Sequence, residues 1–285
     1  MSNLKHTDMK TLREQMLQQM QLKGYSERTI STYILCISLL SKYYNLSPDL
    51  ITTSQIRAYI QYCLIERKLS KAWLNQTISA LKILFVQVLK RKWNNIEIPR
   101  PRRERRLPVV FSRDEVKRIL NVHRNLKHRA FLMITYSAGL RISEVCNLKS
   151  ADIDSSRMLV RVVQGKGQKD RYSILSPFAL ESLRLYWNVY KPKQWLFEGY
   201  DHSKIALSTA RSIFKKALKK ADIKKEVGIH ALRHSFATHL LEQGVSLPII
   251  QQLLGHKSLR TTSGYLHVQQ YSINAVKSPL DTLSL

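Results

Sequence analysis

The sequence predicts a mostly α-helical protein with a small antiparallel β-sheet, divided into an N-terminal helical bundle and a larger α+β domain. Three observations support this fold class. Apolar residues recur at helical spacing through most of the chain, two β-rich runs flank a glycine-containing segment, and a proline-framed stretch separates residues 1–98 from residues 109–285. With 285 residues, of which 44% are hydrophobic, the chain is long enough for about two cores.

Residues 1–98 are expected to form a bundle of four helices. Apolar side chains lie at helical spacing in Ile30–Leu40, Ile56–Leu64 and Leu74–Val88, and Met9–Leu22 is expected to form a shorter opening helix. Four helices within about 100 residues are typical of a small helical bundle.

Residues 99–108 are expected to form a basic linker. Its prolines fix φ, remove backbone donors and discourage helix in the residues before them, which favours an extended segment. The arginines of this stretch are either a solvated hinge or a strap that lies on phosphates, and the basic charge of the whole chain favours the strap. The arginines expected to bind DNA in this way are Arg102, Arg103, Arg105 and Arg106.

Residues 109–285 are expected to form the α+β domain and to end in a C-terminal tail. Ser112-Arg-Asp-Glu115 is a capping box that begins a helix. Met158–Val163 and Tyr172–Leu175 are β-rich runs, and the residues between them predict a hairpin. Further helices are expected over Lys127–Ser137, Ser176–Tyr190, Leu207–Lys220, His230–Leu241 and Leu247–Leu254.

Charge and composition restrict the class of function. The net charge of +27 indicates a polyanionic partner, with nucleic acid the first candidate. The apolar stretches are far shorter than the roughly 18 residues that span a bilayer, and residues 1–10 contain no apolar leader, so we expect a cytoplasmic, nucleoid-associated protein without a membrane partner. The three cysteines are scattered and are expected to be reduced thiols, and no glycine-rich nucleotide-binding motif occurs. A basic bundle joined by a basic linker to a larger domain suggests a clamp around duplex DNA.

Several polar residues stand in a sequence context that is unusual for solvent-exposed surface residues. Arg141 follows a glycine break between apolar runs, so its guanidinium is expected to be partly buried and to need an anion. Either it pairs with Glu144, three residues further on, or it projects into a cleft and holds a phosphate. His230 and Arg233 share one helical face by their spacing of three, which would direct both at one anion.

Lys166 lies between two glycines at the tip of the expected hairpin. The glycines alone favour a simple turn, but they would also let the backbone approach a groove and leave the ammonium free to reach a ligand. Lys169 and Arg171 add charge beside it and are expected to bind DNA. His256 and Tyr265 complete the series, although a lone tyrosine is more often half-buried packing.

A metal site is a second interpretation of the histidines, because His230 and His234 are four residues apart and His239 follows. However, no glutamate follows His230 as in a metalloprotease helix, and Arg233 would repel a cation. We therefore expect no metal and no small-molecule cofactor.

Two arginines, a lysine, two histidines and a tyrosine are the groups that phosphoryl transfer without a metal requires. Guanidiniums stabilise the charge on the non-bridging oxygens, and a tyrosine hydroxyl with a pKa of about 10 attacks when it loses its proton near cations. A lysine protonates the leaving oxygen, and histidines take or return the proton of the tyrosine. Because a phosphotyrosyl bond conserves the energy of the broken diester, ATP is not needed.

These residues resemble the motifs of the tyrosine recombinases, the phage integrase family, in its two-domain type. The resemblance covers nearly the whole chain, with a helical core-binding domain before the linker and a catalytic domain after it. The motifs follow one another in the family order, as Ala138–Glu144, Gly165–Gly167, His230–His239, Leu253–His256 and Thr262–Val268.

The resemblance implies a site-specific recombinase or integrase that cleaves and rejoins double-stranded DNA through a 3′-phosphotyrosyl intermediate. It also implies a homotetramer on two duplexes, with strand exchange through a Holliday junction. The implied roles are phosphate binding by Arg141 and Arg233, general acid for Lys166, general base for His230, assistance at the phosphate by His256, and nucleophilic attack by Tyr265.

Two alternatives stay open at this point. A type IB topoisomerase would use the same chemistry to relax supercoils, although the helical core-binding domain and the short chain favour recombination. A non-catalytic DNA-binding protein would keep the charge but would not need both arginines, Lys166 and Tyr265 together.

Overall fold

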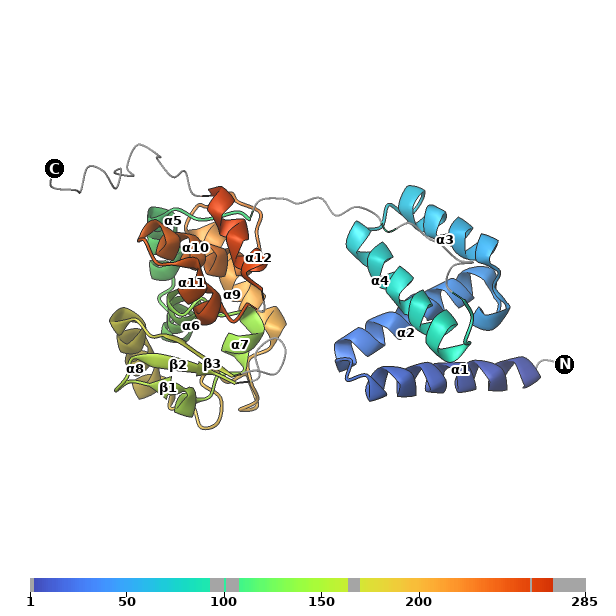
Figure 1. The fold of residues 1–285 in the computed structure, drawn as a ribbon. Helices are drawn as coiled ribbons and strands as arrows, with labels where there is room; N and C mark the ends of the chain where they lie inside the picture. Colours follow the sequence, from blue (N-terminus) through green and yellow to red (C-terminus); the bar gives the residue numbers. More distant parts are fainter. Residues whose placement is uncertain (1–2, 93–99, 101–107, 164–169, 257, 269–285) are drawn as a thin grey trace, which may run out of the picture. The chain divides into compact units, whose positions relative to one another are not determined.

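The computed structural model describes residues 3–92, 100, 108–163, 170–256 and 258–268, and the chain divides into two compact units, Met1–Arg105 and Arg106–Leu285 (Figure 1). The described residues are mostly helical, with a small antiparallel sheet, which confirms the predicted fold class. None of the described helices is long and apolar enough to cross a membrane. Several residues expected to act on DNA lie outside the described residues, namely Arg102, Arg103, Arg105, Arg106, Lys166 and Lys169.

The N-terminal unit is built from helices whose first turns are capped by hydroxyl side chains. Ser26 and Ser70 accept backbone N–H bonds at the starts of the second and fourth helices, and Thr52 forms a capping box at the third. A π-helix, η2, continues the last of them. The bounds are α1 Asn3–Leu22, α2 Glu27–Tyr44, η1 Pro48–Leu50, α3 Thr53–Ile65, α4 Lys71–Lys82 and η2 Ile83–Val88.

Apolar faces of these helices meet in a single core, which includes Met20, Leu40, Ile56, Leu74 and Phe85. α1 begins earlier than the expected Met9, because the first residues of the chain extend the helix without contributing to the apolar pattern.

In the C-terminal unit, a three-stranded antiparallel sheet has the order β1 (Ile153–Asp154), β2 (Leu159–Val162) and β3 (Arg171–Ile174) among the described residues. β2 and β3 are the strands of the expected hairpin, with Val162 opposite Arg171. β1 was not predicted, because two residues give too short a pattern to recognise.

The helices of this unit pack around a core that includes Phe131, Leu140, Val160, Phe197 and Phe214. Figure 1 shows α10, α11 and α12 gathered in one part of the unit, with α11 packed against β3 of the sheet. The bounds are α5 Arg113–Asn121, α6 Leu126–Ser137, α7 Ile142–Cys146, η4 Ser150–Asp152, α8 Pro177–Tyr190, α9 Leu207–Lys220, α10 His230–Glu242, α11 Leu247–Leu254, α12 Leu259–Thr262 and η5 Ser263–Val268.

Candidate active site

Three arginines surround one glutamate at the centre of the site. Nη1 and Nη2 of Arg171 donate to Oε1 and Oε2 of Glu144 at 2.9 and 2.8 Å. Nη1 of Arg141 donates to Oε1 at 2.7 Å, and Nη1 of Arg233 lies 3.6 Å from Oε2. Burial alone would raise the pKa of Glu144, but the bonds from Arg171 and its neighbours outweigh burial and lower this pKa to about 2. The carboxylate is therefore ionised at neutral pH and holds the guanidiniums in place.

A glycine directs the chain toward Arg141. α6 ends at Ser137, and Gly139 has a φ of +58°; a Cβ there would lie 2.3 Å from Cδ1 of Phe236. The Arg141 N–H donates to Oε2 of Glu144 at 2.7 Å at the start of α7. The pairing of Arg141 with Glu144 is thus observed, and 17% of the Arg141 side chain remains exposed.

Arg233 joins three parts of the domain from its place in α10. Its Nη1 donates to the carbonyl of Gly139 at 2.7 Å, and its Nη2 donates to the carbonyl of Leu254 at the end of α11. Burial, together with the nearby cation Arg141, lowers the pKa of Arg233 to about 9, so it remains charged at neutral pH. This guanidinium is held by the backbone rather than left to move.

Arg171 lies within this cluster and connects β3 to the end of α11. Its Nε donates to the carbonyl of Leu253 at 2.9 Å. Gly255 ends α11 with a φ of +62°, and a Cβ there would lie 2.7 Å from Cδ of Arg171. Arg171 was expected to bind DNA, and only 9% of its side chain is exposed. Contact with DNA stays a prediction for this residue.

Tyr265 lies in η5 and is only 4% exposed. Its ring belongs to an apolar cluster with Phe236 and Leu254, and its hydroxyl lies 3.1 Å from Nδ1 of His234. Burial raises the pKa of Tyr265, whereas the charges of Arg233 and Arg141 act in the opposite direction. The positive charges of both guanidiniums therefore favour the ionised form of the phenol.

His256 is a second histidine whose ring lies near that of Tyr265. Their rings are nearly parallel, with an interplanar angle of 17° and centroids 6.3 Å apart. Nδ1 of His256 bonds to Oγ1 of Thr262 at 2.9 Å, which fixes the orientation of the imidazole. Burial, then Arg233 and Arg141, lower the pKa of His256 to about 4, so this histidine is neutral at physiological pH.

His230 begins α10, and its side chain is exposed. Partial desolvation by its packed neighbours, followed by the charges of Arg233 and Arg141, lowers its pKa. Within the described part of the chain, no hydrogen bond joins His230 to Tyr265, so its expected role as general base stays a prediction.

The fold thus brings together Arg141, His230, Arg233, His256 and Tyr265, five of the six catalytic candidates, and the sixth, Lys166, lies outside the described residues. Sequence reasoning missed His234 as a partner of Tyr265. The sequence did contain a signal for this contact, because His234 is one helical turn after His230 and adjacent to Arg233. The same spacing is also typical of a metal site, which is how it was interpreted. Among the described residues, no group of three or more His, Cys, Asp or Glu side chains is arranged to hold a metal ion.

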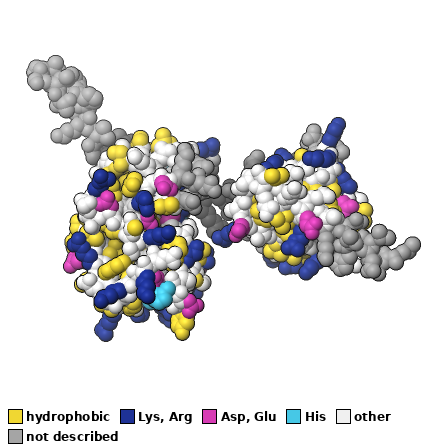
Figure 2. Space-filling view, turned by 90° about the horizontal axis from the view of Figure 1, so that it is seen from below, with side chains coloured by type: hydrophobic (Ala, Val, Ile, Leu, Met, Phe, Trp, Pro, Cys, Tyr) yellow, Lys and Arg dark blue, Asp and Glu magenta, His cyan; other side chains and the backbone are white. Residues whose placement is uncertain are grey.

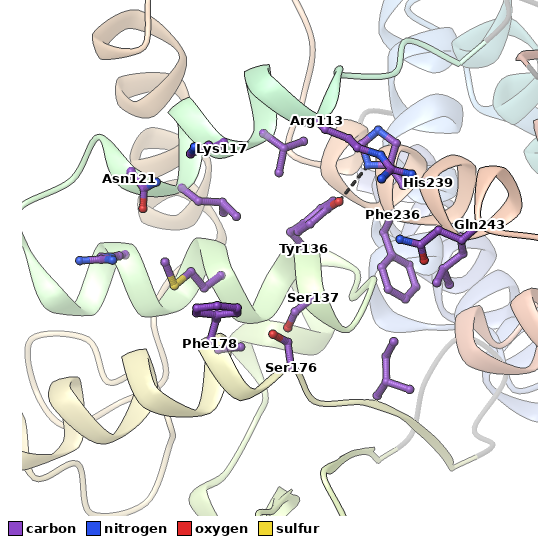
Figure 3. A pocket seen from close by; sticks show the side chains of 17 residues that line it. Arg113, Lys117, Asn121, Tyr136, Ser137, Ser176, Phe178, Phe236, His239 and Gln243 are labelled. Carbon is purple, nitrogen blue, oxygen red and sulfur yellow. Dashed lines mark hydrogen bonds between the residues drawn. The ribbon is translucent and has the colours of Figure 1, made fainter. Parts of the chain in front are cut away.

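A separate cavity of about 750 Å³ borders α5, α6, the start of α8 and α10. Figure 3 shows Tyr136 and His239 pointing toward one another in its wall, and the Tyr136 hydroxyl lies 2.8 Å from Nδ1 of His239. α10 therefore carries two histidines that each contact a tyrosine hydroxyl, and only His234 contacts Tyr265.

Comparison with known proteins relates both units to one family. The model of the phage integrase family matches residues 110–271, and the phage integrase N-terminal SAM-like domain matches residues 12–95. A putative integrase/recombinase of Sinorhizobium fredii is 42% identical over 280 residues, which cover 96% of this chain and 90% of the relative.

Two further proteins extend this comparison. The tyrosine recombinase XerA of Thermococcus kodakarensis is 36% identical over 256 residues, covering 87% of this chain and 88% of the relative. A lambda integrase tetramer bound to a Holliday junction has a similar fold, with a TM-score of 0.70, 20% identity, and coverage of 90% of this chain and 76% of that chain.

Proposed function

The chain belongs to the phage integrase family, as a tyrosine-type site-specific recombinase, and from this premise we propose that Tyr265 attacks a phosphodiester of duplex DNA and forms a 3′-phosphotyrosyl bond. The observation that carries the proposal is the position of Tyr265, which is buried with its hydroxyl 3.1 Å from Nδ1 of His234, the residue that follows Arg233 in α10. A phenol becomes a competent nucleophile when nearby cations stabilise its anion.

Arg141 and Arg233 bind the non-bridging oxygens of the scissile phosphate. Glu144 and the backbone carbonyls hold these guanidiniums before DNA arrives, so little reorganisation is needed when charge develops on the phosphate. Neutral His256 donates a hydrogen bond from its Nε2 to the same phosphate, because its Nδ1 faces the hydroxyl of Thr262.

The two ends of the reaction need opposite proton transfers. Lys166 gives a proton to the leaving 5′ oxygen of the DNA, and a histidine of α10 takes the proton of Tyr265, a role that the resemblance gives to His230. Neither a metal nor ATP takes part, since the phosphotyrosyl bond retains the energy of the diester for rejoining.

The remaining charge grips the DNA backbone. Figure 2 shows Lys and Arg side chains spread over the visible face of each unit, among fewer acidic ones. Contacts of this kind are made with phosphates and are indifferent to sequence. We propose that the helical unit clamps the duplex and that four protomers act on two duplexes in the cytoplasm, exchanging strands through a Holliday junction.

A nicked suicide duplex that bears the target site tests the proposed function. The protein is expected to form an SDS-resistant adduct with this duplex in the presence of EDTA, because the liberated 5′ fragment diffuses away and prevents rejoining. Proteolysis and mass spectrometry of the adduct should place the DNA on the peptide that contains Tyr265. A requirement for Mg²⁺, or an adduct on another residue, would overturn the mechanism.

The linker arginines supply a second prediction, measured as the salt dependence of binding. Replacing Arg102, Arg103, Arg105 and Arg106 with alanine should reduce the slope of log K against log salt by about 4 if each neutralises one phosphate. Fluorescence anisotropy with a labelled duplex between low and moderate salt measures this slope. An unchanged slope would identify these arginines as a solvated hinge.

A further inference from the structure

The partner of the Tyr265 hydroxyl is a histidine to which the resemblance gives no role. Nδ1 of His234 lies 3.1 Å from this hydroxyl, and the two ring centroids are 5.7 Å apart. His234 is half-buried in the second turn of α10, whereas His230 is exposed at the first residue of the helix. Geometry is the first requirement for a general base, and His234 meets it in this structure.

The surroundings keep His234 neutral and therefore able to accept a proton. Burial lowers its pKa, and the charges of His230 and Arg233 on the same helix act in the same direction. His256 faces it from the segment after α11 and is itself neutral, with a pKa of about 4. The hydroxyl of Tyr265, from η5, lies against Nδ1, and it donates its O–H to this nitrogen in the tautomer of His234 whose ring proton is on Nε2.

We propose that His234 is a catalytic residue that accepts the phenolic proton of Tyr265 as the tyrosine attacks DNA. The proposal rests on the proposed phosphotyrosyl function. In the cleavage step the O–H bond of Tyr265 breaks and an N–H bond forms on Nδ1 of His234. The Oη–P bond forms, the P–O5′ bond breaks, and the 5′ oxygen takes a proton from Lys166. Rejoining reverses each transfer, so no external acid or base is consumed.

A positive charge on His234 then appears when the phosphate carries its greatest negative charge. The imidazolium faces the phosphate bound by Arg141 and Arg233, which offsets the burial that disfavours it in the resting site. His230, at the exposed start of the helix, is left free to contact the phosphate or the sugar rather than the phenol.

The second histidine–tyrosine pair of α10 provides a matched control. His239 contacts the hydroxyl of Tyr136 at 2.8 Å in the wall of the separate cavity. His239 and His234 lie on the same helix, and each contacts the hydroxyl of a different tyrosine through its own Nδ1. Burial raises the pKa of both tyrosines, but only Tyr265 lies in the field of Arg233. A purely structural role for such pairs predicts similar consequences at both positions.

The experiment compares single-turnover cleavage by His234→Asn, His230→Asn and His239→Asn. Asparagine places an oxygen near the position of Nδ1, so it accepts the hydrogen bond of the tyrosine but not its proton. Each variant is assayed on the suicide duplex and on the same duplex with sulfur in place of the 5′ bridging oxygen, whose thiolate leaves without a proton. Gel-shift binding to the uncleaved duplex shows which variants remain folded, and His234→Gln replaces His234→Asn if the latter does not bind.

His234→Asn is expected to slow cleavage by about 100-fold on both duplexes. The proton transfer that it removes activates the nucleophile and does not depend on whether oxygen or sulfur leaves. The fall in wild-type rate at acidic pH, as His234 is protonated, should disappear in this variant. His239→Asn should bind and cleave within about twofold of wild type, since its partner Tyr136 is affected by Arg113 and not by Arg141 or Arg233.

Two results would overturn the proposal: cleavage by His234→Asn near the wild-type rate, or recovery of its rate on the sulfur-containing duplex, which would place His234 on the leaving-group side. Failure of the proposed function is seen separately, as an adduct that survives Tyr265→Phe. If Tyr265→Phe abolishes the adduct while His234→Asn cleaves normally, only the assignment of His234 is wrong.

Discussion

Tyr265→Phe is expected to abolish the covalent adduct, with a loss of cleavage of about 10⁴-fold or more. The substitution removes one oxygen atom, the proposed nucleophile, from a ring that packs against Phe236 and Leu254. Because the aromatic ring keeps its apolar contacts, the domain should remain folded and should still bind DNA. SDS gel electrophoresis of a labelled suicide duplex measures the adduct, and anisotropy measures the binding.

Tyr136→Phe is the matched control for this substitution. The hydroxyl of Tyr136 also forms a hydrogen bond with a histidine of α10, but this tyrosine lines the separate cavity. It is expected to lose a hydrogen bond worth about 1 kcal/mol of stability and to keep its cleavage activity. Equal losses in both variants would mean that the hydroxyl of Tyr265 acts through stability rather than as the nucleophile.

The largest expected effect on stability belongs to Glu144→Gln. The substitution leaves Arg141, Arg171 and Arg233 close together without the carboxylate that binds them, and an amide cannot neutralise their charge. We expect the free energy of unfolding at pH 7 to fall by about 3 kcal/mol, measured by urea denaturation. Cleavage should fall as well, because one of the two carboxylate oxygens that orient Arg141 and Arg171 is replaced by an NH₂ group, which cannot accept their hydrogen bonds.

The pH dependence of this stability follows from the pKa of Glu144. The pKa falls from the ordinary value of 4.5 to about 2 in the folded protein. A lowered pKa means that the carboxylate contributes its full stability above pH 4.5 and loses it as the pH falls toward 2. Urea midpoints of the wild type should therefore decline through this window more steeply than those of Glu144→Gln.

Glu198→Gln is the control that distinguishes a loss of stability at acidic pH from a loss of cleavage activity. Hydrogen bonds from His202 and from the N–H groups of Gln194 and Lys193 lower the pKa of Glu198 to about 2 as well. Glu198→Gln is expected to reduce acid-dependent stability but to leave cleavage at neutral pH unchanged, because it lies outside the arginine cluster. If the cleavage rate fell equally in both variants, the role of Glu144 in orienting the arginines would be wrong.

Local sequence signals predicted the longer helices, because each signal acts over a few residues, whereas the short α7 and α12 were not predicted. The capping box of Ser112 and Glu115 begins α5 as expected, and the apolar spacing predicts Leu207–Lys220 as α9. The run Ile83–Val88 is a π-helix, and nothing in its apolar spacing distinguishes it from a continued α4.

The site depended on contacts that local signals do not contain. Arg141 was predicted because a cation among apolar residues needs an anion wherever it lies, and Arg233 because its spacing of three from His230 directs both side chains at one anion. Arg171 looked like a surface cation beside Lys166, but its partner Glu144 is 27 residues away in the chain. His234 was overlooked because its partner, Tyr265, is 31 residues away and comes near only when η5 packs against α10.

The contact between Arg171 and Gly255 has a mechanical consequence. Arg171 is the first residue of β3, and Gly255 immediately precedes His256. A side chain at 255 would displace Arg171, whose Nε also donates to the carbonyl of Leu253, so β3 and the end of α11 are linked at this point. Strand β3 and the end of α11, directly before His256, are thereby held together by one arginine side chain.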